Sequence, residues 1–211
     1  LDAVRASDDL EPICIVTRRA PRTVGDCGNI PVISFNDVMS LKDRVDVMIL
    51  CFGSQRDLPV LSPMLAENFN IIDSFDDHGQ IPGHFDRVNK MASDSGHTAV
   101  ISAGWDPGIF SLARAACSVF MPDGEYLTLW GPGVSQGHSN ALRNIPEVTD
   151  AIQYTVPLDT VAEDFKAGKH FSDPARECHR RVCLVAVKEG ADRALIEKKI
   201  KEMSDYFEGY D

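Results

Sequence analysis

Short apolar runs alternate with helix-like segments through the first half of this chain. The clearest runs stand at 11–16, 45–51, 70–73 and 98–102, each bounded by turn-forming residues and too short for a helix. The segments 58–68 and 81–95 between them are predicted helices. Because parallel strands need a crossover, strands that alternate with helices indicate a parallel sheet. The sequence therefore predicts an α/β fold with a Rossmann-type, doubly wound parallel sheet.

The pattern changes after residue 104. Strands are predicted at 126–130, 151–156 and 181–187, and helices at 110–121, 159–169 and 193–203. Strands and helices in this order suggest an α+β domain. We therefore expect one domain over residues 1–104 and a second over residues 105–211.

The charge balance excludes several classes of partner. The chain has 32 acidic and 21 basic residues, which gives a formal net charge of −11. Nucleic-acid binding requires a concentrated basic patch, so we expect neither a nucleic-acid surface nor one for anionic membranes. No run approaches the roughly 20 apolar residues of a membrane span. A small molecule is the expected partner.

The six cysteines point to a reducing compartment. None forms a Cys-x-x-Cys pair, and several stand in apolar runs, which is typical of buried thiols in a cytoplasmic protein. Cys178, His179 and Cys183 hint at a metal, but they lack a second group of ligands. We expect a cytoplasmic protein with no metal site.

Polar or glycine-bearing turns follow the strands predicted in the first half of the chain. They are Thr17–Arg19, Gly53–Ser54, Ser74–Asp76 and Ala103–Gly104. In open α/β sheets the carboxyl ends of the strands share one edge, and ligands bind there. The last of these turns continues as Gly104-Trp105-Asp106-Pro107-Gly108. This segment offers an apolar wall beside a proton acceptor, or it is a strand-ending turn with a core tryptophan.

The turn after the first predicted strand indicates the cofactor. In dinucleotide-binding folds, an arginine at the end of the second strand accommodates the 2′-phosphate of NADP, whereas an acidic residue there selects NAD. Arg18 and Arg19 have no acidic neighbour, which favours NADP; the alternative is an exposed basic pair. The glycine-rich Gly-x-Gly-x-x-Gly loop of this fold is absent. We expect it, with the first strand, to lie before Leu1.

Two aspartates and an arginine are candidates for chemistry. If their strands are neighbours, Asp76 and Asp106 face one cleft, where they could hold an ammonium group and move a proton. Aspartate also caps helices and forms turns, so a structural role is the alternative. Arg181 could bind a carboxylate in bidentate fashion. The histidines at 84, 97 and 170 look like surface or packing residues, and Ser139 is a predicted helix cap.

Several segments together resemble the meso-diaminopimelate dehydrogenase family. They are 51–54, 72–78, Gly104–Gly108, Trp130–Ser139, 153–155 and 205–207, in order along the whole chain. The resemblance implies NADP-dependent oxidative deamination of the D-configured centre of meso-diaminopimelate to L-2-amino-6-oxopimelate, which cyclises to tetrahydrodipicolinate. The reverse reaction serves lysine synthesis. It also implies a homodimer, with residues 1–104 as dinucleotide-binding domain and 105–211 as substrate-binding and dimerisation domain.

The resemblance also implies roles for individual residues. Asp76 and Asp106 would be catalytic and bind the reacting amino group, while Trp105, Trp130 and Gln136 would shape its pocket. Thr155 and Arg181 would hold the carboxylate of the distal L-centre. The implied cofactor-binding residues are Thr17, Arg18, Arg19, Cys51, Phe52, Gly53, Ser54, Ser74, Phe75, Asp76, Ala103, Gly104, Trp105, Asp106 and Pro107.

Two departures qualify the resemblance. Asn140 stands where aspartate is often expected, and family members continue past Asp211. Two alternatives stay open: a related NADP-dependent dehydrogenase or reductase of another amino or oxo acid, and a non-catalytic NADP-binding module.

Overall fold

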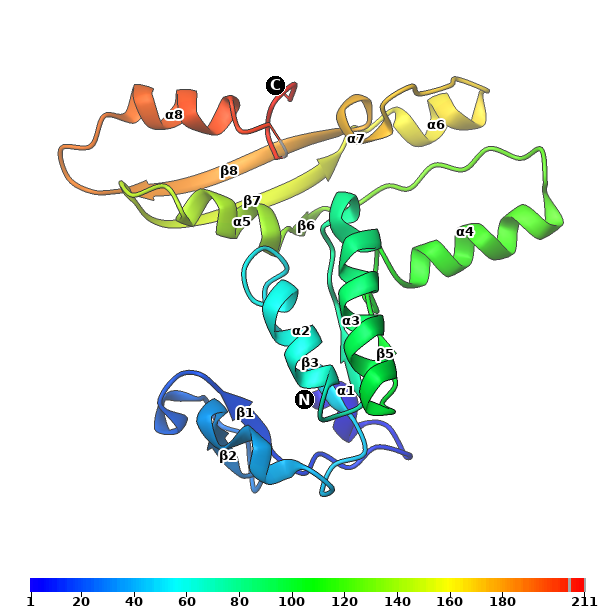
Figure 1. Ribbon diagram of the computed structural model, residues 1–211. Coiled ribbons are helices and arrows are strands. Elements are labelled where there is room, and N and C mark those ends of the chain that lie inside the picture. The colour runs from blue at the N-terminus through cyan, green and yellow to red at the C-terminus, as the bar shows by residue number, and fades with distance from the viewer. Residues whose placement is uncertain (205, 211) are drawn as a thin grey trace. The chain divides into compact units, whose positions relative to one another are not determined.

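The chain forms two compact units, Leu1–Ala116 and Cys117–Asp211 (Figure 1). The computed structural model describes residues 1–204 and 206–210. Asp205, which belongs to one segment behind the family resemblance, lies outside the described residues. The domain boundary expected after Gly104 stays a prediction.

The first unit contains two parallel sheets. β1 (Ile15–Thr17) pairs with β2 (Val32–Ser34), while β3 (Met48–Leu50), β4 (Ile71–Asp73) and β5 (Ala99–Val100) form a second sheet in the order β3-β4-β5. The predicted α/β fold class is confirmed. A doubly wound sheet has the order 3-2-1-4-5-6, which places strand 1 between two such groups. None of the described residues occupies that position.

The helices of the first unit connect these strands. α3 (Ile81–Ser95) begins with Pro82 in its first turn and ends at Gly96, which has a φ of 72°. Proline fits a first turn because its missing N–H would be unpaired there, and glycine accepts the left-handed cap. The remaining helices are α1 (Asp2–Arg5), η1 (Pro21–Thr23), η2 (Phe35–Leu41), α2 (Leu58–Ala66), η3 (His78–Gln80) and α4 (Ile109–Phe120), the last of which crosses the unit boundary.

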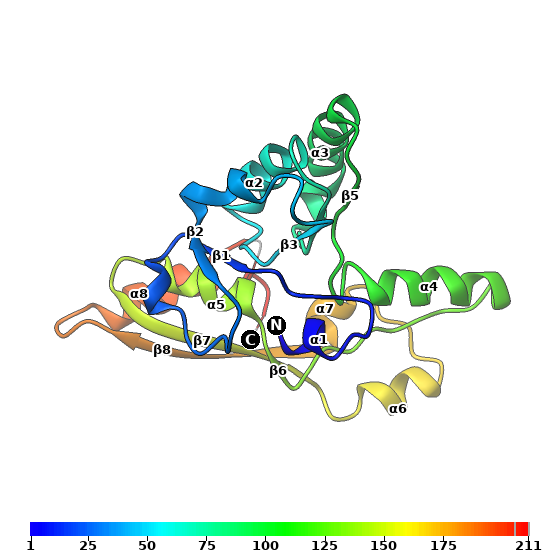
Figure 2. The same cartoon turned by 90° about the horizontal axis from the view of Figure 1, so that it is seen from below.

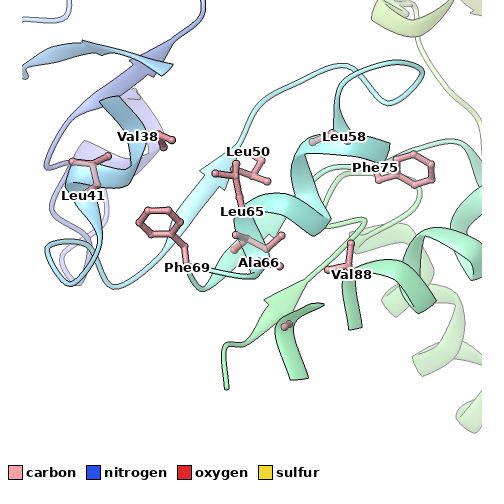
Figure 3. Close-up of a cluster of buried hydrophobic side chains, with 11 residues drawn as sticks. Val38, Leu41, Leu50, Leu58, Leu65, Ala66, Phe69, Phe75 and Val88 are labelled. Atoms are coloured by element: carbon pink, nitrogen blue, oxygen red, sulfur yellow. The ribbon is translucent and has the colours of Figure 1, made fainter. Parts of the chain in front are cut away.

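The core of the first unit lies between the β3-β4-β5 sheet and the helices α2 and α3. Figure 3 shows Leu50 from β3, Leu65 from α2 and Val88 from α3 within this cluster, all at most 3% exposed. Successive side chains of a strand point to opposite faces. Ile49 and Val100 are each 49% exposed, so the other face of the sheet is largely uncovered by the described residues.

The second unit is an antiparallel sheet with helices. β7 (Val148–Pro157) and β8 (His179–Val187) run side by side as a long pair in Figure 2, and β6 (Gly133–Val134) pairs with the other edge of β7. Leu142, Ala151, Ile196 and Phe207 belong to its main buried cluster. The helices are α5 (Gln136–Arg143), α6 (Val161–Lys166), α7 (Pro174–Glu177) and α8 (Arg193–Lys201).

Two local predictions in the second unit are wrong. Residues 126–130 form no strand; Leu127 and Leu129 instead pack on a small cluster with Val161, Phe171 and Cys178, which explains the alternating pattern. Ser139 is not the cap of α5. The N-cap is Ser135, whose hydroxyl accepts from the His138 N–H at 3.5 Å.

Among the described residues, none of the helices is both long and apolar enough to cross a bilayer.

Candidate active site

Parallel pairing brings the polar turns of the first unit to one sheet edge. Leu50 lies opposite Asp73, and Ile71 lies opposite Ala99, so β3, β4 and β5 run in register in the same direction. The turns 51–54, 74–76 and 102–108 follow the carboxyl ends of these strands. Most of the predicted cofactor and catalytic residues are carried by these three turns.

The two arginines of the turn after β1 differ in their contacts. Both guanidinium nitrogens of Arg18 donate to the Asp57 carboxylate, at 2.7 and 2.6 Å, and its carbon lies 5.1 Å from the centre of the Phe52 ring. This hydrogen-bonded pairing lowers the pKa of Asp57. Arg19 is exposed, and its guanidinium makes no hydrogen bond or ion pair with the described residues. Arg19 is therefore the side chain of the two that is available to an anion.

The turns after β3 and β4 are joined by a hydrogen bond. The Asp76 N–H donates to the Ser54 hydroxyl at 3.0 Å. The Asp76 side chain is exposed and makes no hydrogen bond or ion pair with the part of the chain that the structure describes. The backbone at Asp76 is thus held by Ser54, while its carboxylate is available to a ligand.

A buried carboxylate stands behind these turns. Asp73, 1% exposed, accepts from the Ser62 hydroxyl and from His84 Nε2, each at 2.7 Å, and from two backbone N–H groups. Burial alone raises the pKa of Asp73, but the hydrogen bonds together outweigh it and lower this pKa. Of the two predicted roles of His84, surface or packing residue, the packing role is confirmed, since its ring is fully buried and stacks on Phe75. Its hydrogen bond to Asp73 was not predicted.

The 104–108 turn is closed by glycine. The Gly104 N–H donates to the Pro107 carbonyl at 3.1 Å, and the Ile109 N–H donates to the Gly104 carbonyl at 3.0 Å. Gly108 has a φ of 133°, and a Cβ there would overlap the Gly104 carbonyl. No other residue fits without rearrangement. The tight turn leaves the Trp105 side chain 72% exposed.

Asp106 is held by an arginine that the sequence reasoning did not single out. Arg114 of α4 donates to both carboxylate oxygens, at 2.5 and 3.1 Å, and the Asp106 side chain is only 6% exposed. A bidentate arginine fixes the orientation of a carboxylate as well as its charge. Arg114 stands eight residues after Asp106, within α4, and no motif indicated the contact.

In the second unit, Thr155 and Arg181 lie directly opposite each other on β7 and β8. The Thr155 oxygen accepts from Arg181 Nη1 and, at 3.3 Å, from Gln153 Nε2. A hydroxyl has two acceptor sites and one hydrogen to donate. With both acceptor sites used, the Thr155 hydrogen is left to donate, and the buried Nε of Arg181 has no partner among the described residues.

Tyr210 is a further contact of Arg181. Its hydroxyl accepts from Arg181 Nη2 at 3.0 Å, and its ring centre lies 4.6 Å from the guanidinium carbon. Both residues line a pocket of about 620 Å³ along β8 and α8. Tyr210 stands 29 residues after Arg181, and no motif indicated the contact.

Trp130 is anchored by a histidine. The backbone N–H of Trp130 donates to His179 Nε2 at 3.0 Å, while His179 Nδ1 faces the carbonyls of Pro174 and Ala175. Burial lowers the pKa of His179. The next residue, Gly131, has a φ of 99°, and a Cβ there would overlap the Thr155 carbonyl. This close approach places the Trp130 segment against β7.

α5 begins beside the same strand. Gln136 is exposed in its first turn. His138 lies two residues further, with Nδ1 at 2.7 Å from the Ser135 hydroxyl and its ring against Tyr206 and Phe207. Burial, with a smaller contribution from the Arg181 charge, lowers the pKa of His138 to about 4. His138 is therefore neutral in the folded protein at physiological pH.

The chain is similar in sequence to known diaminopimelate dehydrogenases. Residues 104–211 match the family model described as diaminopimelic acid dehydrogenase C-terminal domain. The meso-diaminopimelate D-dehydrogenases of Ureibacillus thermosphaericus and Corynebacterium glutamicum are 48% and 39% identical to it, over 99% and 96% of this chain. The chain spans 64% and 62% of their lengths.

Solved structures agree with this similarity. A structure of C. glutamicum DAP dehydrogenase in complex with DAP has a TM-score of 0.89 at 37% identity. An engineered D-amino acid dehydrogenase bound to NADP⁺ has a TM-score of 0.88 at 36% identity. Each alignment covers 100% of this chain and 64% of the other.

The lowered pKa of His138 predicts a pH-dependent stability. Between about pH 6.5, the pKa of an unfolded histidine, and about 4, the unfolded state binds more protons, so the free energy of unfolding falls as the pH falls. For this residue the fall between pH 7 and pH 5 amounts to about 2 kcal/mol. His138→Gln should lose this contribution in urea unfolding at the two pH values.

The matched control is His170→Gln, whose side chain is 73% exposed. It should keep the pH dependence of the parent protein. An unchanged dependence in His138→Gln would contradict the assignment.

Proposed function

The chain belongs to the diaminopimelate dehydrogenase family, and we propose that the protein of which it forms part is a meso-diaminopimelate dehydrogenase. The substrate's D-configured centre and NADP⁺, with one water, would give L-2-amino-6-oxopimelate, ammonium, NADPH and a proton. The oxo acid then cyclises to tetrahydrodipicolinate, and the reverse reaction would serve lysine synthesis. Beyond the family, the observation that carries the proposal is the pair of carboxylates, Asp76 and Asp106, on adjoining turns of one sheet edge.

The first unit fits NADP. Arg19 would bind the 2′-phosphate, because its guanidinium makes no hydrogen bond with the described residues. The guanidinium nitrogens of Arg18 are bonded to Asp57, so Arg18 would contact the cofactor through the flat face of its guanidinium. Thr17 stands beside them and already accepts from the Arg19 N–H at 3.1 Å. When bound, NADP⁺ accepts the hydride. The turns 51–54, 74–76 and 103–107 would line the rest of the cofactor.

The two aspartates would divide the work at the reacting amine. Arg114 compensates the charge of Asp106 and fixes its position, which suits a group that orients the ammonium. Asp76 has no side-chain partner among the described residues, which suits a group that takes up the proton. Loss of that proton is required because hydride leaves the α-carbon readily only when its nitrogen is neutral.

The second unit would recognise the distal centre of the substrate. Thr155 and Arg181 together offer a hydroxyl hydrogen and a planar cation, which match the two oxygens of a carboxylate. Trp130 and Gln136 would contribute to binding of the substrate, as would Trp105. The same donors would also suit a dicarboxylic amino acid other than meso-diaminopimelate, so the assay must include stereoisomers.

Two properties of the chain support a cytoplasmic homodimer. All six cysteines are free, as expected where thiols stay reduced. Val182 and Leu184 alternate with the pocket residues of β8 and are 39% and 59% exposed, which leaves an apolar strip on the opposite face. A second copy of the chain would cover this strip.

The function is tested by substrate choice in the full-length protein. We expect NADPH formation with meso-diaminopimelate and none with the LL isomer, which has no D-centre. Asp106→Asn should lower kcat/KM by about 100-fold or more, because proton and charge placement at the reacting atoms contributes on that scale. Both are measured by NADPH absorbance.

Asp77→Asn, next to Asp76 but outside the proposed site, is the control and should stay within about 2-fold. Equal turnover of both isomers, or of another amino acid instead, would favour a related dehydrogenase. NADP binding without any turnover would favour a non-catalytic module.

Cofactor choice is tested at Arg19. Arg19→Ala should raise the KM for NADP by about 10-fold or more and leave that for NAD nearly unchanged, because a charge-assisted hydrogen bond contributes about 1.5–3 kcal/mol. Arg22→Ala, an exposed arginine in η1, is the matched control. Equal losses for the two cofactors would show that Arg19 is only a surface charge.

The proposed dimer is tested at Leu184. Leu184→Glu places a charge in the apolar strip and should shift the mass measured by light scattering from dimer toward monomer. Arg180→Glu changes charge on the same strand face and is the control for charge alone. A parent protein that is monomeric at micromolar concentration would refute the homodimer.

A further inference from the structure

A single buried carboxylate connects four segments of the first unit. Asp73 ends β4, and its Oδ2 accepts from Ser62 of α2 and from His84 of α3, both at 2.7 Å. All three side chains are at most 1% exposed. Because all three side chains are shielded from water, removal of the Asp73 carboxylate would leave Ser62 and His84 without a replacement hydrogen-bond partner.

The other carboxylate oxygen holds the two turns that carry the proposed catalytic groups. Oδ1 accepts from the Phe75 N–H at 3.1 Å and from the Ser102 N–H at 3.0 Å. The backbone carbonyl of Asp73 accepts from the Ala103 N–H at 2.8 Å. Phe75 directly precedes Asp76, and Ala103 begins the segment that leads to Asp106. Both turns are therefore attached to one residue.

The backbone at Ser102 shows why such an anchor matters. Ser102 has a φ of 57°, the left-handed region that residues with a Cβ seldom adopt. Holding such a residue in this region is unfavourable unless its surroundings compensate. The bond from the Ser102 N–H to Asp73 is placed to provide that compensation.

We propose that Asp73 is a positioning residue of the active site, which sets the Asp76 turn and the Ser102–Asp106 segment relative to each other. This inference rests on the proposed function for its catalytic consequence. Asp73 touches no reacting atom; it acts through Asp76 and Asp106. Ser62 and His84 belong to the anchor because they orient the carboxylate from the side opposite the turns.

The geometry makes asparagine a conservative replacement. Its amide oxygen can accept from the same two backbone N–H groups as Oδ1. Its NH₂ group would face Ser62 and His84, and both can present an acceptor: the serine hydroxyl rotates, and the histidine changes tautomer. His84 Nδ1 has no hydrogen-bond partner among the described residues, so neither tautomer breaks an existing contact at that nitrogen.

The test compares three variants of the full-length protein. Asp73→Ala should lower kcat for meso-diaminopimelate by about 10-fold or more with the KM for NADP within about 3-fold, and Asp73→Asn should recover most of that kcat. Val88→Ala is the control for stability. Val88 lies one turn from His84 on α3, is 1% exposed and takes part in none of the hydrogen bonds of Asp73. Free energies of unfolding are measured for all three.

Amide hydrogen exchange gives a readout that needs no substrate. In Asp73→Ala, exchange should rise at residues 74–77 and at 102–108 together, and Val88→Ala should leave the second segment unchanged. The inference is overturned if Asp73→Ala loses no more kcat than Val88→Ala at equal stability, or if the two turns do not respond. A parent protein inactive on meso-diaminopimelate would contradict the proposed function, while the exchange data would still decide the anchor.

Discussion

The parallel register of β3, β4 and β5 is the constraint on which the first unit depends. Because all three strands run in the same direction, their carboxyl ends lie at one edge, and the turns that follow them are neighbours. Residues as far apart in the chain as Ser54 and Asp76 can then share a hydrogen bond. An antiparallel arrangement would send alternate turns to opposite edges and separate the proposed groups.

In the second unit, the antiparallel pairing of β7 and β8 determines which side chains lie opposite each other. The register of β7 and β8 sets Thr155 across from Arg181, and the alternation of the strands places both on the face that carries Gln153 and Cys183. A shift of one residue would turn the hydroxyl away from the guanidinium. The contact between Thr155 and Arg181 therefore depends on a ladder of backbone hydrogen bonds rather than on a loop.

Local signals explain what could be predicted from the sequence. The bounds of α3 agree with the prediction because Pro82 and Gly96 mark its ends and apolar spacing marks its buried face. Residues 126–130 were misassigned because their alternation reflects a small packed cluster rather than a strand partner. The turns at the sheet edge could be located because each follows a strand end.

Side-chain partners could not be predicted in the same way. Asp57 lies 39 residues from Arg18, and Arg114 and Tyr210 have no motif around them. Asp73 and His84 were the most misleading pair, since an aspartate before a turn and a lone histidine are both common on surfaces. Only the packing of α2 and α3 against β4 shows that they are enclosed together.

The two glycines at close backbone approaches have a consequence for attempts to redesign the protein. Gly108 and Gly131 each leave no room for a Cβ, the first against the 104 carbonyl and the second against the 155 carbonyl. The main-chain path beside Trp105 and Trp130 is thus closed to substitution at these two points. Variation is open to the side chains that this backbone displays, and libraries that leave both glycines untouched will contain the fewest misfolded members.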